Sequence, residues 1–211
     1  MSYSSIPKEE IELFKQLKDL KVIFDVGTRA DTDYIELKPE AEFHLFEPNP
    51  DFFDELYKKI KGKSNVYANK YGLGRKNQEM GYQKDLQSFI DSEAVNTPYA
   101  KGEIILPMKT LDTYLLENDI KQIDFIKMDT EGYELNILLG ATNWFHIIKY
   151  LQYEHWGIHN NKMIIGLLQD DFEIKDIGYR NMFCMNKKLV DKEETKRLKN
   201  YIKENKLAEL Q

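Results

Sequence analysis

One stretch of the chain, residues 123–141 (IDFIKMDTEGYELNILLGA), restricts the possible folds more than any other. It begins with a mostly apolar run, passes through the acidic turn 129–132 (DTEG), and then repeats apolar residues at helical spacing as far as Gly140. This order predicts a buried strand, a tight turn and a helix. Because ligands of open α/β sheets bind at the carboxyl ends of the strands, the acids of this turn are candidates for a site. The alternative is that Asp129 and Thr130 only cap the helix.

The rest of the chain repeats this alternation of strand and helix. Strands are expected at residues 21–26, 42–46, 65–68, 123–128 and 147–153, and helices at residues 7–19, 51–60, 110–118, 160–168 and 192–207. Strands that alternate with helices predict a doubly wound α/β fold with a parallel sheet. Residues 172–178 and 181–186 predict a terminal pair of strands joined by a short turn.

The segment from residue 71 to residue 109 is less regular. Residues 78–84 and 103–107 have the composition of strands, whereas residues 85–99 show no strong period. We expect this stretch to cross the edge of the sheet or the face of the active site. Irregular loops of this kind often carry specificity. Acceptor specificity is therefore expected in residues 74–109 and in residues 156–163.

Length and composition fit one globular domain spanning residues 1–211, with an N-terminal helix in residues 1–20 and a C-terminal helix in residues 190–211. Of the 211 residues, 42% are hydrophobic and 31% are charged, which is typical of an ordinary globular protein. Residues 1–20 lack the apolar core of a signal peptide, and no stretch is long enough to span a membrane. A cytoplasmic protein is therefore expected. No apolar stripe is distinct enough from the core to predict an oligomeric state.

The net charge of −6 argues against a nucleic acid or an anionic membrane as the partner. Cys184 is the single cysteine, so neither an intramolecular disulfide nor a cysteine-based zinc site can form within the chain. Its apolar surroundings predict a buried, inert thiol.

Four of the expected strands end in polar residues. In a parallel sheet all of these endings project from one edge, so the sequence predicts a polar cleft above an apolar sheet. The residues concerned are Asp25 and Gly27 at the end of the first strand, Glu47 after the second, Asp129 and Glu131 after the fourth, and Glu154 and His155 after the fifth.

These endings suit a nucleotide-like ligand. A glycine at position 27 lets the backbone approach a ligand closely, and Glu47 can accept hydrogen bonds from both hydroxyls of a ribose. The chain lacks the later glycines of G-x-G-x-x-G and has no G-x-x-x-x-G-K-[ST] motif, which argues against binding of a pyrophosphate or a nucleoside triphosphate. A ribose-containing ligand without a pyrophosphate remains, and S-adenosylmethionine is the obvious candidate.

Five segments in this order, VIFDVGT, FHLFEPNP, KTLDTYL, FIKMDTEGYELNILLGA and LQYEH, resemble the FkbM family of S-adenosylmethionine-dependent methyltransferases. The resemblance covers residues 22–155, and the I-K-x-D-x-E-G-x-E block is its most specific part. It implies a class I methyltransferase (Rossmann-like) fold, with a mostly parallel seven-stranded sheet whose last strand is antiparallel. It also implies O-methylation of a sugar or another hydroxylated small molecule.

The resemblance also assigns roles by motif position. The chain departs from the family pattern at residues 29–31 (RAD), where members commonly carry another glycine. This departure leaves a second hypothesis open, a catalytically inactive binding or interaction protein with a methyltransferase fold. The acidic net charge and the absence of an N-P-P-Y-type motif argue against a third hypothesis, a methyltransferase that acts on nucleic acid. The expected cofactor-binding residues are Asp25, Gly27, Thr28, Glu47 and Asp129, and the central block comprises Lys127, Asp129, Glu131 and Glu134.

Methyl transfer to oxygen requires removal of the hydroxyl proton, and His155 is the natural candidate for the base. Asp129 or Glu131 could orient His155 or the substrate. The alternative is that His155 only lines the cleft. Glu154, His155 and His159 could instead join Asp129 as ligands of a divalent ion, but two unrelated surface histidines are favoured, so no metal is expected.

Two further side chains are expected near this cleft. Lys127 lies within an apolar strand, and a buried lysine needs an acidic partner, for which Glu131 or Glu47 is expected. Trp156 is adjacent to His155 and is the better candidate of the two tryptophans for contact with substrate.

Overall fold

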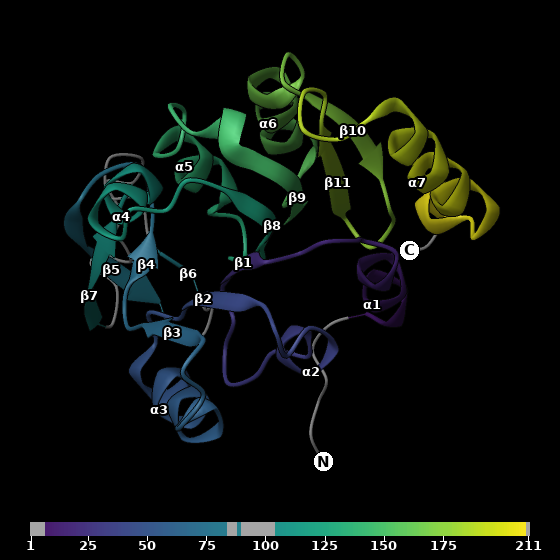
Figure 1. The fold of residues 1–211 in the computed structure, drawn as a ribbon. Helices are drawn as coiled ribbons and strands as arrows, with labels where there is room; N and C mark the ends of the chain where they lie inside the picture. Colours follow the sequence, from purple (N-terminus) through teal and green to yellow (C-terminus); the bar gives the residue numbers. More distant parts are fainter. Residues whose placement is uncertain (1–6, 84–87, 90–103, 210–211) are drawn as a thin grey trace.

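The computed structural model describes residues 7–83, 88–89 and 104–209, and its centre is a seven-stranded sheet (Figure 1). The strand order is β10-β11-β9-β8-β1-β2-β3. The five strands from β9 to β3 in this order run parallel to one another. They are β1 (Val22–Val26), β2 (Glu42–Phe46), β3 (Val66–Asn69), β8 (Ile123–Met128) and β9 (Ile148–Glu154).

The sheet ends in an antiparallel hairpin. Strand β11 (Asn181–Asn186) pairs antiparallel both with β9 and with β10 (Phe172–Asp176). The predicted doubly wound sheet with a terminal antiparallel hairpin is thereby confirmed. The strand order changes direction between β1 and β8, so the crevice in which open α/β sheets bind ligands lies above the carboxyl ends of these two strands.

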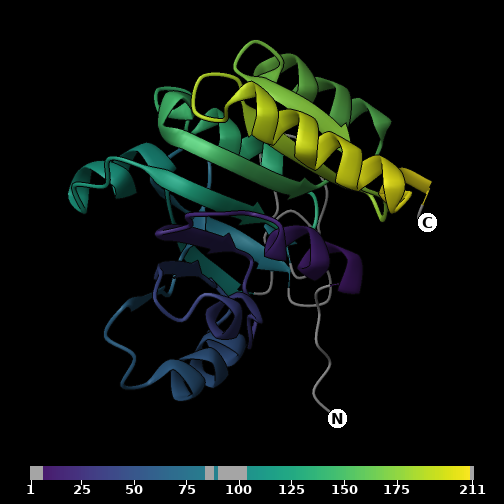
Figure 2. The same ribbon diagram turned by 45° about the vertical axis from the view of Figure 1, so that its right-hand side comes forward.

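Helices cover both faces of the sheet (Figure 1, Figure 2). One core cluster packs α4, α5 and α6 against the sheet, and a second packs α1, α2, α3 and α7 against its other face. None of the helices in the described ranges has the length and apolar content needed to cross a membrane. The helices are α1 (Lys8–Lys15), α2 (Tyr34–Leu37), α3 (Pro50–Ile60), α4 (Leu111–Glu117), α5 (Glu134–Leu139), α6 (Ile158–Leu168) and α7 (Lys192–Glu204), with 3₁₀ turns at Phe145–Ile147 and Leu207–Glu209.

Three of these helices begin at a side chain that caps them. Asn49 accepts a hydrogen bond from the backbone N–H two residues later, and Thr110 and Asp191 each accept one from the N–H three residues later. Such caps satisfy donors that have no partner inside the helix. In α3 the cap is followed by Pro50 in the first turn, where the missing N–H of proline costs nothing.

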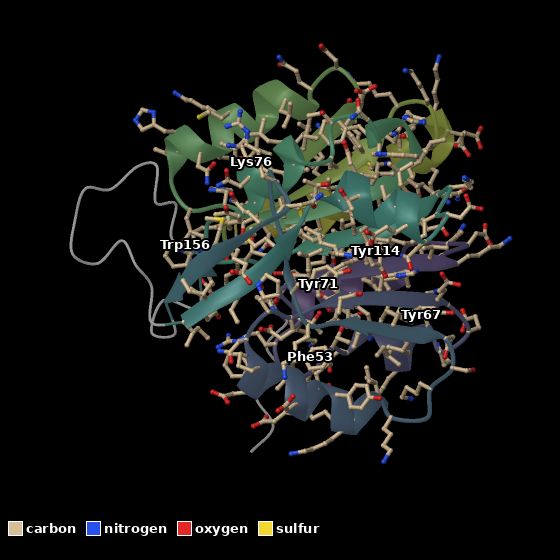
Figure 3. The ribbon with its side chains drawn as sticks, turned by 90° about the vertical axis from the view of Figure 1, so that its left-hand side faces the viewer. Phe53, Tyr67, Tyr71, Lys76, Tyr114 and Trp156 are labelled. Atoms are coloured by element: carbon tan, nitrogen blue, oxygen red, sulfur yellow. The ribbon has the colours of Figure 1, made fainter. Side chains whose placement is uncertain are left out.

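A second, smaller sheet lies beside the central one, and Figure 3 views the molecule from its side. Its order is β4-β7-β5-β6, with β5 and β7 antiparallel. The strands expected at residues 78–84 and 103–107 are confirmed, while most of the irregular stretch 85–99 lies outside the described residues. The four strands are β4 (Gly72–Leu73), β5 (Gln78–Gln83), β6 (Ser88–Phe89) and β7 (Ile104–Lys109).

A buried charged cluster joins α1 to the middle of the central sheet. Lys127 of β8 is only 3% exposed, and its Nζ lies 3.2 Å from Asp129 Oδ2 and 3.5 Å from Glu10 Oε2. Glu10 belongs to α1 and is buried as well. Its carboxylate also accepts hydrogen bonds from Asn181 Nδ2 at 2.9 Å and from Gln152 Nε2. The N-terminal helix is therefore bound to three strands through one carboxylate.

The expected pairing of Lys127 with Glu131 or Glu47 is wrong. Side chains alternate along a strand, and this alternation directs Lys127 to the face covered by α1, where Asp25 is its register partner on β1. Burial lowers the pKa of Lys127, but Tyr34 and the nearby carboxylates outweigh burial and raise this pKa well above its usual value. The ammonium therefore stays charged inside the protein.

Replacing Lys127 by methionine should destabilise the fold, because it leaves the buried Glu10 and Asp25 and the half-buried Asp129 close together without a cation. Removing one partner of a buried ion pair typically costs about 3–5 kcal/mol. Urea unfolding of Lys127→Met measures this loss. The exposed Lys121→Met serves as the control and should change stability by less than about 0.5 kcal/mol. A loss below about 1 kcal/mol for Lys127→Met would contradict this account of the cluster.

Candidate active site

A pocket lies at the carboxyl edge of the parallel strands. Its empty volume, counting the open mouth, is about 520 Å³. Four of the predicted site residues come together in its wall, namely Gly27, Glu47, Asp129 and Glu131, whereas Asp25, Thr28 and His155 do not line it. The remaining lining residues are Val26, Arg29, Phe46, Pro48, Phe52, Gly72, Leu73, Tyr82, Thr130 and Tyr133.

Gly27 brings two strand ends into close contact. Its φ is +87°, and a Cβ added there would lie 1.9 Å from the carbonyl oxygen of Asp129. No other residue fits this position without displacement of the backbone. Its N–H donates to the carbonyl oxygen of Phe46 at 3.0 Å. The glycine therefore holds the ends of β1, β2 and β8 together at the pocket.

Glu47 is presented to the pocket with both carboxylate oxygens held. Oε2 accepts from the N–H of Arg29 and Oε1 from the N–H of Asn49, each at 2.7 Å. Burial raises the pKa of Glu47 to about 7, although these two hydrogen bonds oppose the rise. Each carboxylate oxygen can accept more than one hydrogen bond, so both retain capacity for a ligand hydroxyl.

Arg29 occupies the loop in which the family commonly has another glycine. Its φ is +58°, in the left-handed region that glycine adopts at little cost. The backbone N–H still reaches Glu47, and the guanidinium lies 5.4 Å from the centre of the Phe52 ring. The altered loop thus keeps a backbone conformation suited to glycine and adds a cation to the pocket wall.

Asp25 and Thr28 lie behind the pocket wall. Each is 4% exposed, and Thr28 Oγ1 donates to the backbone oxygen of Asp25 at 2.9 Å. Burial raises the pKa of the Asp25 carboxyl to about 6, and the charge of Lys127 opposes this rise. These two residues shape the loop after β1, and the pocket is lined by the loop's other residues.

The acidic turn after β8 is held by Glu134. The Glu134 Oε1 accepts hydrogen bonds from the N–H and the hydroxyl of Thr130, both at 2.8 Å, and from the N–H of Gly132 at 3.3 Å. Burial raises the pKa of Glu134 to about 7. The position preceding α5 is Tyr133, which makes no side-chain cap. The alternative in which Asp129 and Thr130 cap this helix is therefore wrong, and Asp129 is left to face the pocket.

Glu154, at the end of β9, contacts the same group of acids. Burial raises the pKa of Glu154 to about 8, and the charge of the neighbouring Asp129 adds to this rise. Its Oε1 lies 3.2 Å from Arg180 Nη2, and its Oε2 accepts from Trp156 Nε1 at 3.2 Å. Sequence reasoning placed Glu154 at the cleft but gave the acid–base role to the next residue.

His155 is directed elsewhere. Successive side chains at the end of a strand alternate in direction, so His155 does not share the side on which Glu154 lies. Its N–H donates to the backbone oxygen of Arg180 at 2.9 Å, and its Nδ1 is buried without a hydrogen-bond partner among the described residues. Burial lowers the pKa of His155. Within residues 7–83, 88–89 and 104–209, no three His, Cys, Asp or Glu side chains are arranged to hold a metal ion.

Arg180 was missed by sequence reasoning. Its guanidinium lies 4.0 Å from the centre of the ring of Trp156, which is itself 46% exposed and is labelled in Figure 3. Gly178, Tyr179 and Arg180 all have positive φ, and two of them carry side chains that disfavour this conformation. Strained backbone of this kind concentrates at functional sites. The sequence signal, a Gly-Tyr-Arg turn between two strands, identified the hairpin but not the direction of the arginine.

The sheet order, the antiparallel β11 and the pocket above β1 and β8 define a class I methyltransferase fold. The crystal structure of the methyltransferase FkbM from Methylobacillus flagellatus is similar, with a TM-score of 0.55 at 16% identity over 79% of this chain and 43% of that one. Precorrin 8w decarboxylase from Methanobacterium thermoautotrophicum gives a TM-score of 0.50 at 12% identity over 88% of this chain and 96% of that one. At these identities the likeness concerns the fold alone.

A sequence profile of the methyltransferase FkbM domain matches residues 25–180. The chain therefore belongs to the FkbM methyltransferase family. It is 25% identical over 148 residues to the hexuronic acid methyltransferase AglP of Haloferax volcanii, covering 69% of this chain and 61% of AglP. It is 26% identical over 170 residues to methyltransferase 1 of Beauveria bassiana, covering 69% of this chain and 64% of that protein. The chain thus spans less than two thirds of the length of either relative.

The buried acids make stability depend on pH. Asp25, Glu47, Glu134 and Glu154 all have raised pKa values, so the folded state binds more protons than the unfolded state up to about pH 8. The free energy of unfolding should therefore fall as the pH rises from 6.5 to 8.5. The lowered pKa values of His44 and His155 act in the opposite direction, mainly below the unfolded histidine pKa of about 6.5, at the lower limit of this window.

Urea unfolding at pH 6.5 and 8.5 measures this slope, and Glu134→Gln should reduce it because one of the four groups is lost. The exposed Glu79→Gln is the matched control and should keep the slope. A free energy of unfolding that rises with pH across this window would show that the buried acids ionise normally.

Proposed function

We propose that the protein transfers a methyl group from S-adenosylmethionine to a hydroxyl of a sugar. The observation that carries this proposal is the geometry of Glu47, whose two oxygens are fixed by backbone N–H groups at the end of β2. An acid in this position of a doubly wound sheet accepts the hydroxyls of a ribose. Gly27, beside it, lines the same pocket.

The pocket residues fit the three parts of this cosubstrate. Glu47 would bind the ribose, and the apolar side chains of Phe46, Leu73 and Tyr82 would pack against the adenine. Asp129 and Glu131 would place negative charge near the positively charged sulfur. When bound, S-adenosylmethionine supplies an electrophilic methyl group to the acceptor oxygen.

A hexuronic acid sugar is the acceptor class we propose. The support is the similarity to AglP, a hexuronic acid methyltransferase. The end of β9 adds suitable chemistry, because an exposed aromatic ring at Trp156 and a cation at Arg180 lie together there. Aromatic rings pack against apolar faces of ligands, and guanidinium groups bind carboxylates.

Calorimetric titration with S-adenosylmethionine tests the cosubstrate pocket. Glu47→Gln should weaken binding roughly 10- to 100-fold, because hydrogen bonds to a charged acceptor each contribute about 1.5–3 kcal/mol. Affinity of the unsubstituted protein should rise as the pH rises through about 7, where Glu47 ionises, and Glu47→Gln should remove this dependence. The control, Glu79→Gln, should bind normally. If Glu47→Gln and the control bind S-adenosylmethionine with equal affinity, Glu47 does not bind the ribose.

Transfer of a labelled methyl group tests the acceptor. We expect p-nitrophenyl glucuronide to be methylated faster than the corresponding neutral glucoside, with the label recovered as an ether. Equal rates with both glycosides would contradict the acceptor class while leaving the cosubstrate proposal intact. Binding of S-adenosylmethionine without transfer to any hydroxylated acceptor would favour the second hypothesis, a catalytically inactive binding protein.

A further inference from the structure

We propose that Glu154, and not its neighbour His155, takes the proton of the acceptor hydroxyl during methyl transfer. This inference rests on the proposed function and assigns one step of it to one residue. The pocket takes its wall from the ends of β1, β2 and β8. Strand β9 is the next neighbour of β8 in the sheet, so its end lies beside the end of β8, and an acceptor bound next to the pocket on this side would meet Glu154.

The contacts of Glu154 suit a base. Met128 and Tyr153 are register partners on β8 and β9, so Asp129, which lines the pocket, and Glu154 follow them side by side at the strand ends. Arg180 holds Oε1 and Trp156 holds Oε2, each at 3.2 Å. A carboxyl fixed at both oxygens by different elements has a defined direction, as proton transfer requires.

The charges around Glu154 come from several elements. Asp129 and Glu131, in the turn that follows β8, favour the protonated form, and Arg180, before β11, favours the ionised form. Together with burial they raise the pKa of Glu154 to about 8. A base works best when its pKa lies near the working pH, because it is then both available and strong. His155 lacks this support, since burial lowers its pKa and its backbone N–H is hydrogen-bonded to Arg180 of the hairpin turn.

Methyl transfer forms one bond, breaks one bond and moves one proton. The acceptor oxygen forms a bond to the methyl carbon while the bond from that carbon to sulfur breaks and its electron pair stays on sulfur. The positively charged sulfur becomes a neutral thioether. The hydroxyl proton passes to the ionised Glu154 carboxylate, which returns it to water after the product leaves.

Two adjacent substitutions separate the candidates. Glu154→Gln keeps the size of the side chain and one carbonyl oxygen, which can accept from Arg180 or from Trp156, but it cannot take a proton, so turnover of p-nitrophenyl glucuronide should fall roughly 10²- to 10⁴-fold. Affinity for S-adenosylmethionine should stay within about twofold, because Glu154 does not line the pocket. The matched control His155→Asn should lose little turnover. In the unsubstituted protein, turnover should rise with pH through about 8.

A measurement on the free protein needs neither acceptor nor cosubstrate. With ¹³C-labelled glutamate, NMR should show one carboxyl carbon that titrates near pH 8 and disappears in Glu154→Gln, while His155→Asn keeps it. Full turnover by Glu154→Gln, or loss of turnover only in His155→Asn, would overturn the inference and leave the proposed function standing. Failure of the intact protein to bind S-adenosylmethionine would overturn both.

Discussion

The buried ammonium of Lys127 is the interaction on which the rest of the structure depends. It lies in the central strand and is held between Glu10 of the N-terminal helix and Asp129 at the pocket. A charge in this position is tolerated only because carboxylates surround it. The same contacts bind α1 to the sheet and orient an acid of the pocket. Glu10 lies outside residues 25–180, so a residue beyond the matched domain contributes to the electrostatics of its site.

The pocket itself depends on backbone placed in unusual conformations. Gly27, Arg29, Glu131 and Gly132 all have positive φ and all lie in loops that follow β1 or β8. These loops bring carboxylates to one edge of the sheet, where burial and mutual repulsion raise their pKa values. Perturbed pKa values of this kind cluster at functional sites. The pH dependence of stability and that of chemistry therefore arise from one group of side chains.

Most of the fold could be predicted from sequence, because hydrophobic periodicity identified the strands and main helices of the central sheet. The polar strand endings also predicted that Gly27, Glu47, Asp129 and Glu131 would meet. Three-dimensional partners could not be predicted, because they depend on which face of a strand meets which helix. The partner of Lys127, separated by 117 positions in the chain, and the contact of Arg180 with Glu154 are of this kind. His155 and Glu154 are neighbours at the same strand end, and only the direction of each side chain decides which of them lies beside Asp129.

A crystal structure with S-adenosylhomocysteine bound would test the central claim most directly, because it locates the ligand relative to the strand ends. Both ribose hydroxyls are expected within hydrogen-bonding distance of Glu47, with the sulfur on the side of Asp129. A ligand bound away from the ends of β1, β2 and β8, or a ribose that does not contact Glu47, would contradict it.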